Sequence, residues 1–255
     1  MDPRMKRRSM LGQPYGASST SLNRNTPSSP SQPSYETQQP TARIKLVCVG
    51  DGGIGKTSLF TRYVRGEFPE TYVPTVFDNH IKNVKFKQHL VELALWDTAG
   101  QEEYDRLRAL SYPETDAILL CYSIDEPMSL ENAYERWKPE VALYCPGVPV
   151  VLVGLKSDFS DRPDALDWRS GEELARKIGA VSFITCSAKT GHHIDEVFVA
   201  ALAAVLDPPL PGELQTTVSR EQSTKQAPAQ KAPATAVKPD APAGKRKRRH
   251  RCLIL

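Results

Sequence analysis

Four short apolar runs alternate with segments of helical spacing in the middle of this sequence, and this alternation constrains the fold more than any other feature. The apolar runs cover residues 43–50, 116–124, 148–155 and 180–185. The segments with apolar residues at helical spacing cover residues 57–66, 129–144, 170–179 and 193–206. Strands that are apolar on both faces and are connected by helices form a parallel sheet with helices on both sides.

A further pair of strands should be antiparallel. Residues 80–86 and 90–96 both have strand patterns and only a short connection, so they form a hairpin. Ser170 and Gly179 are expected to start and stop one of the helices. We therefore predict an α/β fold with a six-stranded, mostly parallel sheet, one antiparallel edge, and helices on both faces.

Composition divides the 255 residues into one domain and two tails. Residues 1–40 are rich in Ser, Pro, Gln and Asn, and residues 208–251 form a linker that is dominated by Pro, Ala, Gln and Lys up to residue 244 and ends in the basic residues 245–251. Neither tail can bury enough apolar surface to fold, so we expect both to be disordered. Residues 41–207 remain, and they suffice for one well-packed domain.

Composition also excludes several classes of protein. No run of 18 or more apolar residues could span a bilayer, the N-terminus lacks the apolar region of a secretory signal, and Asp2 excludes N-myristoylation. The net charge is +3, and the chain outside the basic residues 245–251 is slightly acidic, so no nucleic-acid partner is expected. Four of the five cysteines are scattered and are expected to be buried thiols in a reducing compartment.

A glycine-rich loop follows the first apolar run and opens the first helical segment. It fits the pattern G-x-x-x-x-G-K-[ST], in which backbone N–H groups surround a phosphate chain at a helix N-terminus. Lys56 would reach the β and γ phosphates, and the Thr57 hydroxyl would bind Mg²⁺. The alternative is a glycine-rich turn with an incidental lysine. The predicted phosphate-binding residues are Gly50, Asp51, Gly52, Gly53, Ile54, Gly55, Lys56, Thr57 and Ser58.

Two later segments predict the rest of a phosphate and magnesium site. In DTAGQE, Asp97 can hold Mg²⁺ through water, Gly100 permits close approach to a γ-phosphate, and Gln101 can orient an attacking water. Thr75, in the polar connection between the first helix and the hairpin, can complete the Mg²⁺ shell when a γ-phosphate is present. The alternatives are an ordinary turn and an exposed loop threonine.

The segment GLKSD, residues 154–158, predicts the choice of base. The Asp158 carboxylate can accept hydrogen bonds from the N1–H and 2-amino groups of guanine, whereas adenine would leave it unpaired at a large cost. The stem of Lys156 can cover one ring face, and Phe68 can contact its edge. The segment TCSAK then adds Ser187 and the backbone N–H groups of Ala188 and Lys189, which can reach guanine O6.

Together these motifs resemble the Ras superfamily of small GTPases over about residues 43–206, which implies the P-loop G-domain fold. Trp96 and residues 110–116, LSYPETD, are similar to the Rho family, and the N-terminal extension resembles a fungal Rho branch. The resemblance implies a monomeric, GTP- and GDP-binding switch with Mg²⁺ that hydrolyses GTP slowly through Lys56 and Gln101. It suggests roles in cell polarity, actin, cell-wall or septum control.

The resemblance also implies regulators and effectors. The segment directly before Thr75 has no arginine that could act as a built-in finger, since Arg62 and Arg65 lie on the preceding helix, so a GTPase-activating protein should donate one. An exchange factor and a GDP-dissociation inhibitor are expected, and effectors should read residues 68–80 and 97–112 in the GTP state.

Three features depart from the family pattern. Leu155 replaces the usual Asn or Thr, which removes a hydrogen bond between the base segment and the phosphate loop and predicts faster nucleotide release. Gly53 replaces a common alanine and adds flexibility. Residues 159–173 are too few for the helical insertion typical of Rho proteins, so partners that bind that insertion are in doubt.

The C-terminus predicts a membrane anchor. Cys252 begins a C-a-a-X motif, residues 252–255, whose final Leu favours geranylgeranylation. The basic residues 245–251 would supply the second signal, attraction to an anionic membrane surface, although they could also act as a nuclear localisation signal. We expect a location on the cytoplasmic face of the plasma membrane, with a cytosolic pool.

Two other functions remain as alternatives. A GTP-bound scaffold that does not hydrolyse GTP is disfavoured by Gln101 and by Gly52, where a bulkier residue is absent. A P-loop kinase for a small substrate is disfavoured by Asp158 and the SAK motif.

Overall fold

The computed structural model describes residues 39–71, 73–208, 210, 212 and 214–217. Nearly all of the two predicted tails lies outside the described residues, as do the basic stretch 245–251 and Cys252. Among the described residues, no helix is long and apolar enough to cross a membrane.

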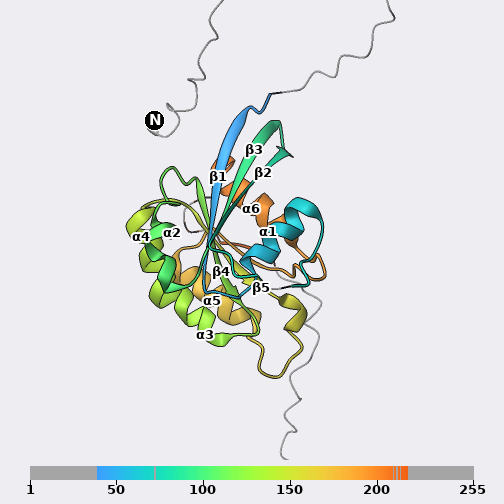
Figure 1. Cartoon of the computed structure of the whole chain (residues 1–255), viewed down its shortest axis with the longest axis vertical. Coiled ribbons are helices and arrows are strands. Elements are labelled where there is room, and N and C mark those ends of the chain that lie inside the picture. The colour runs from blue at the N-terminus through green and yellow to red at the C-terminus, as the bar shows by residue number, and fades with distance from the viewer. Residues whose placement is uncertain (1–38, 72, 209, 211, 213, 218–255) are drawn as a thin grey trace, which may run out of the picture. The chain divides into compact units, whose positions relative to one another are not determined.

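A seven-stranded sheet runs through the described domain (Figure 1), in the order β2-β3-β1-β4-β5-β6-β7. Every neighbouring pair is parallel except β2 and β3, which form the predicted antiparallel hairpin at one edge. The predicted fold class is therefore confirmed. The strands are β1 Ala42–Val49, β2 Phe77–Phe86, β3 His89–Thr98, β4 Ala117–Ser123, β5 Val150–Leu155, β6 Ser182–Thr185 and β7 Gln215–Thr217.

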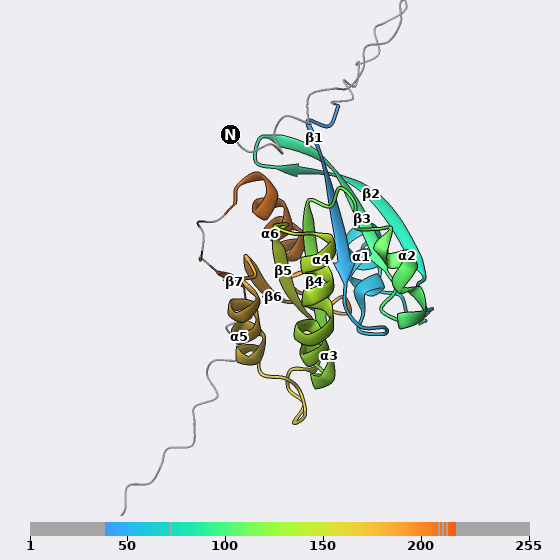
Figure 2. The same ribbon diagram turned by 90° about the vertical axis from the view of Figure 1, so that its left-hand side faces the viewer.

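The seventh strand corrects the expected number of six. β7 extends the opposite edge of the sheet (Figure 2), within the residues 208–251 that composition assigned to a linker. Gln215 N donates to Val181 O at 3.2 Å, and the Ser182 hydroxyl donates to Gln215 O at 2.9 Å. Three polar residues are too short a segment for a periodic pattern, so hydrogen bonds to β6 define this strand and hydrophobicity does not.

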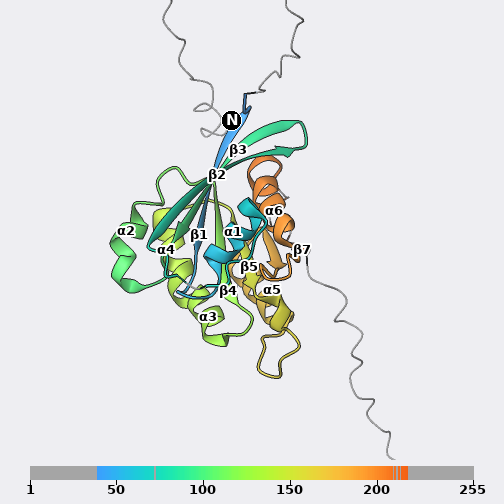
Figure 3. The same cartoon turned by 45° about the vertical axis from the view of Figure 1, so that its right-hand side comes forward.

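Helices cover both faces of the sheet, and each face has its own core. On one face, α1 and α6 lie side by side (Figure 3), where Phe60 and Tyr63 of α1 contact Phe198 of α6. On the other face, α4 and α5 pack with Trp137 against Val47 and Val49. The helices are α1 Lys56–Arg65, α2 Asp105–Ala109, α3 Pro127–Asn132, α4 Lys138–Tyr144, α5 Trp168–Ile178 and α6 Ile194–Leu206.

The start of one helix and the interior of another differ from the sequence prediction. Helix α5 begins two residues before Ser170, because Asp167 is its N-cap and accepts a hydrogen bond from Arg169 N at 3.1 Å. Its predicted end is confirmed, since Gly179 adopts the left-handed conformation with φ +68°. The predicted helix 129–144 is interrupted by a π turn, η3, over Ala133–Trp137.

The base segment is followed by a short connection, as the sequence predicted. After the 3₁₀ turn η4, Ser157–Phe159, residues 160–167 form turns, bends and irregular chain before α5 begins. No helical insertion is present in this connection.

Candidate nucleotide-binding site

A cavity of about 440 Å³ opens at the carboxyl ends of the parallel strands. Crevices at this edge of an α/β sheet are the usual place for ligands, because the loops that follow the strands converge there. Most of the predicted site residues line this cavity: Gly52, Gly53, Ile54, Gly55, Lys56, Thr57, Ser58, Phe68, Thr75, Gly100, Gln101, Lys156, Asp158, Ala188 and Lys189. Four others, Gly50, Asp51, Asp97 and Ser187, do not line it.

The glycine-rich loop takes its shape from backbone conformations that only glycine adopts readily. Gly50 directly follows β1 and has φ +144°, and a Cβ there would lie 2.4 Å from the Cys121 carbonyl oxygen. Gly55 has φ +108° and is the N-cap of α1. The loop therefore delivers the N-terminus of α1, with its unpaired N–H groups and positive dipole end, to the cavity.

Lys56 lies at the floor of this loop. Its ammonium donates to Gly50 O at 2.8 Å and to Asp51 O at 2.6 Å, and the residue is 6% exposed. Burial lowers the pKa of Lys56, while the negative charges of Asp97 and Asp51 oppose that shift. An ammonium has three protons and two are used here, so one donor remains for an anion in the cavity.

An oxygen-rich cluster stands beside Lys56. The hydroxyl oxygens of Thr57, in the first turn of α1, and Thr75, in the loop before β2, are 2.7 Å apart. Asp97 is fully buried, and neither carboxylate oxygen has a hydrogen bond of standard geometry from the described residues. Burial raises the pKa of Asp97, and the nearby Thr57 hydroxyl and Lys56 ammonium oppose the rise. Two hydroxyls and an unsatisfied carboxylate are the type of oxygen donor that Mg²⁺ prefers, so these residues fit the ion.

The segment after β3 packs directly on the glycine-rich loop. A Cβ at Gly100 would lie 2.3 Å from both Asp51 C and Gly52 N, so no side chain fits at this position. A Cβ at Gly52 would lie 3.2 Å from Gln101 Cδ. Gln101 Oε1 is buried without a hydrogen-bond partner among the described residues. The Gln101 amide is therefore held next to the loop with polar capacity unused.

Asp158 is fixed by a residue of the next loop. The Ser187 hydroxyl donates to Asp158 Oδ1 at 2.6 Å, and Thr190 N donates to the Ser187 hydroxyl at 3.2 Å. Ser187 is fully buried, so it orients the carboxylate and does not line the cavity. Each carboxylate oxygen has two lone pairs, so both oxygens of Asp158 can still accept from a ligand.

Sequence reasoning missed Asp125, which holds Lys156. Lys156 has φ +59°, and its ammonium lies 3.2 Å from Asp125 Oδ1. Burial raises the pKa of Asp125, but hydrogen bonds from Ser123 and Lys156 outweigh it and keep the pKa below its usual value. The available signal was a carboxylate directly after the apolar run 116–124, at the strand end that faces the cavity.

Leu155 lines the cavity beside the glycine-rich loop, and its side chain has no polar group that could bond to that loop. It is 2% exposed, and its Cδ1 lies 4.0 Å from the position of a Cβ on Gly55. The side chain belongs to the core cluster beneath the cavity. Faster nucleotide release stays a prediction.

The sequence of this domain is similar to sequences of known proteins. The chain matches the Ras family over residues 45–207. It is 50% identical over 184 residues to the GTP-binding protein RHO1 of Eremothecium gossypii, which covers 68% of this chain and 89% of that protein. The chain belongs to the Ras family, and within it to the Rho branch.

Further Rho relatives agree with this assignment. The GTP-binding protein Rho1 of Kluyveromyces lactis is 51% identical over 175 residues, covering 64% of this chain and 84% of that protein. The GTP-binding protein RHO1 of Candida albicans is 50% identical over 175 residues, covering 64% of this chain and 88% of that protein. The resemblance drawn from the motifs is confirmed.

Proposed function

We propose that this Rho-family protein is a molecular switch that binds GTP and GDP in the cavity and hydrolyses GTP slowly. One observation carries the proposal: the glycine-rich loop, Gln101 and Asp158 converge on the same cavity. Membership of the Ras family and similarity to GTP-binding Rho proteins indicate GTPase activity.

Guanine would be recognised at the Asp158 end. The carboxylate, oriented by Ser187, accepts from guanine N1–H and the 2-amino group, while the stem of Lys156 covers the ring. Asp125 keeps Lys156 in place through its ion pair. Phe68 lies at the cavity wall and contacts the ring edge, and the backbone N–H groups of residues 188–189 serve O6.

The phosphates would lie along the N–H groups of residues 52–58. The third proton of Lys56 donates to the β and γ phosphates. Thr57 and Thr75 would hold Mg²⁺ directly and Asp97 through water, and the ion would neutralise charge on the phosphate oxygens. Gln101 orients the attacking water beside the γ-phosphate.

Lys56 and Mg²⁺ would neutralise only part of the negative charge on the phosphates, so other proteins would regulate hydrolysis. The sequence between Phe68 and Thr75 has no arginine, so intrinsic hydrolysis is slow and an activating protein supplies an arginine. An exchange factor and a GDP-dissociation inhibitor would act on the same protein as a monomer. The segments 68–80 and 97–112 expose the apolar side chains that effectors would contact: Val73, Val76, Phe77, Leu107 and Leu110.

A lipid and a basic segment would place the switch on a membrane. Geranylgeranylation of Cys252 together with residues 245–251 supplies the two signals that stable anchoring to an anionic surface requires. The cytoplasmic face of the plasma membrane, with a cytosolic pool, is the proposed location. Cell polarity, actin, cell-wall or septum control is the proposed role.

Single-turnover hydrolysis of GTP tests the proposal. With Mg²⁺, the wild-type protein should hydrolyse GTP slowly and respond to a Rho-type activating protein by roughly 10³- to 10⁵-fold. Gln101→Leu should bind GTP but lose that response, whereas Gln88→Leu, on the exposed hairpin turn, should behave as wild type. GTP binding without hydrolysis or response in the wild type would instead favour the non-hydrolysing scaffold.

A further inference from the structure

The side chain of Asp51 points away from the cavity, and both of its carboxylate oxygens are bound by one helical segment. Trp137 Nε1 donates to Oδ1 at 2.7 Å, and Asn132 Nδ2 donates to Oδ2 at 2.8 Å. The backbone carbonyl of Asp51 also accepts from Lys56 at 2.6 Å. The same residue therefore connects the Lys56 ammonium to the helical segment 127–144.

The π turn explains how two donors five residues apart reach one carboxylate. In an α-helix of 3.6 residues per turn, residues at this spacing point roughly 140° away from each other. In a π turn, residues joined by the i→i+5 hydrogen bond lie one above the other. The turn η3, Ala133–Trp137, lies immediately after Asn132. π turns often occur at functional sites. We therefore connect this π turn with the binding of the Asp51 carboxylate.

The indole of Trp137 also contacts the segment that follows β3. Trp137 is fully buried, and the guanidinium carbons of Arg108 and Arg136 each lie 4.6 Å from its ring centroid. Arg108 donates to Ala99 O at 2.8 Å, directly before Gly100. Arg136 donates to Glu102 and Asp105, each at 3.2 Å.

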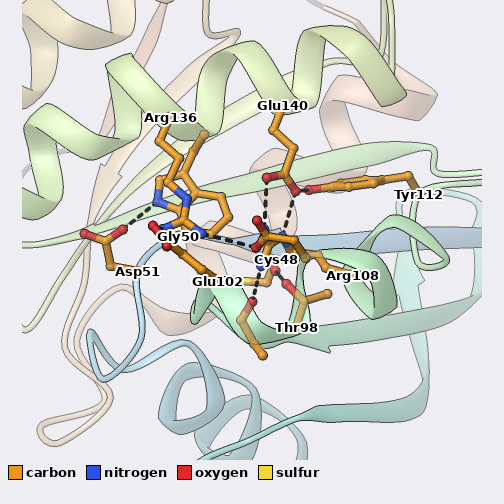
Figure 4. Close-up of polar contacts among 12 residues, drawn as sticks. Cys48, Gly50, Asp51, Thr98, Glu102, Arg108, Tyr112, Arg136 and Glu140 are labelled. Carbon is orange, nitrogen blue, oxygen red and sulfur yellow. Dashed lines mark hydrogen bonds and ion pairs between the residues drawn. The ribbon is translucent and has the colours of Figure 1, made fainter.

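These contacts form one continuous cluster (Figure 4). Arg108 is held from a second side by Glu140, with bonds of 2.6 and 3.0 Å, and Glu140 also accepts from the Tyr112 hydroxyl at 2.5 Å. The side chain of Arg108 is completely buried, so it cannot move without breaking these bonds. The indole N–H group of Trp137 thus donates to Asp51 of the glycine-rich loop, and its ring contacts Arg108 of the segment 97–112.

We propose that Trp137 is a positioning residue that couples the segment 97–112 to the phosphate loop. A partner that displaces this segment moves the Arg108 guanidinium and breaks the hydrogen bonds of Arg136 to Glu102 and Asp105. Both changes shift the indole and weaken its hydrogen bond to Asp51. The Asp51 carboxylate then loses one of its two side-chain donors, and the carbonyl of Asp51 that Lys56 binds is held less firmly. The result is faster release of nucleotide, so the inference rests on the proposed guanine-nucleotide site.

GDP release from the full-length protein tests this coupling. Trp137→Phe keeps the ring between the guanidinium groups but removes the N–H donor, and release should accelerate by about tenfold, since a hydrogen bond to a charged acceptor typically contributes this much. Trp168→Phe, at the start of α5, is the matched control and should release GDP at the wild-type rate. In an Asp51→Asn background, Trp137→Phe should have a smaller effect, because the two residues act as a pair.

The indole N–H resonance of Trp137 provides a second readout that needs no change at Trp137. The chain has three tryptophans, so Trp96→Phe and Trp168→Phe assign the peaks by elimination. The Trp137 resonance should move when GDP is replaced by a non-hydrolysable GTP analogue, and the Trp168 resonance should not.

If the wild type binds GDP, either of two results would overturn the coupling. One is release from a folded Trp137→Phe variant within about twofold of wild type, the other an unchanged Trp137 resonance in the two nucleotide states. Failure of the wild type to bind GDP would instead contradict the proposed function. Even then, Arg136→Ala in the nucleotide-free protein should shift the Trp137 resonance alone, and no shift would refute the coupling.

Discussion

Removing the Ser187 hydroxyl should weaken guanine-nucleotide binding while leaving the cavity wall intact. Ser187 is fully buried, lies outside the cavity lining, and donates to Asp158 Oδ1 at 2.6 Å. In Ser187→Ala the carboxylate keeps its charge but loses this constraint, so it must be ordered again when guanine binds. Hydrogen bonds to charged groups contribute about 1.5–3 kcal/mol. Part of that loss also affects the free protein, so we expect GDP affinity to fall by about 5- to 30-fold.

Displacement of a fluorescent GDP analogue measures this change, and a second buried serine controls for stability. Ser182 is 3% exposed and donates to Gln215 O at 2.9 Å, at the far edge of the sheet. Ser182→Ala should lower the melting temperature to a similar extent but leave GDP affinity unchanged. If Ser187→Ala bound GDP within about twofold of wild type, or if Ser182→Ala weakened binding equally, the role assigned to Ser187 would be wrong.

Three further predictions concern hydrolysis, a buried charge and a strained turn. Gly52→Val should keep GTP binding but slow hydrolysis by about a hundredfold in a single-turnover assay, because a Cβ there already lies 3.2 Å from Gln101 Cδ; an unchanged rate would contradict the placement of Gln101. Arg108→Met should lower the free energy of unfolding in urea by about 3–5 kcal/mol, because Glu140 is left partly buried without its partner; a loss below about 1 kcal/mol would count against that ion pair. Glu114→Gly should raise the free energy of unfolding by about 0.5–1 kcal/mol, because Glu114 is exposed with φ +60°. Glu131→Gly, on the exposed face of α3, should lower it by about 1 kcal/mol, and a loss at both positions would refute the strain at Glu114.

The sequence was most informative where one local pattern determines one element. The strands β1, β4, β5 and β6 are apolar on both faces, so periodicity found them without any knowledge of their neighbours. The glycine-rich loop was predicted equally well, because its residues are consecutive and its backbone conformations depend only on those residues. Most of the cavity lining was predicted for this reason.

The missing features depend on contacts between segments far apart in the chain. β7 is three polar residues that become a strand only beside β6, and Asp125 acquires its partner only when β4 and β5 lie side by side. The π turn at Ala133–Trp137 has an ordinary helical sequence. The hydrogen bonds that Asn132 and Trp137 donate to Asp51 connect residues more than eighty positions apart in the sequence. Propensity describes neighbours in sequence, so it could not indicate this contact.

Calorimetric titration of the purified protein with GDP and with ADP, both in Mg²⁺, addresses the central claim most directly. A site that hydrogen-bonds guanine through Asp158 should reject adenine by roughly 10⁴-fold or more, since adenine would cover the Asp158 carboxylate without donating a hydrogen bond to it. GDP should therefore bind tightly and ADP should give no measurable heat at the same concentrations. Equal affinities for the two nucleotides would contradict the account.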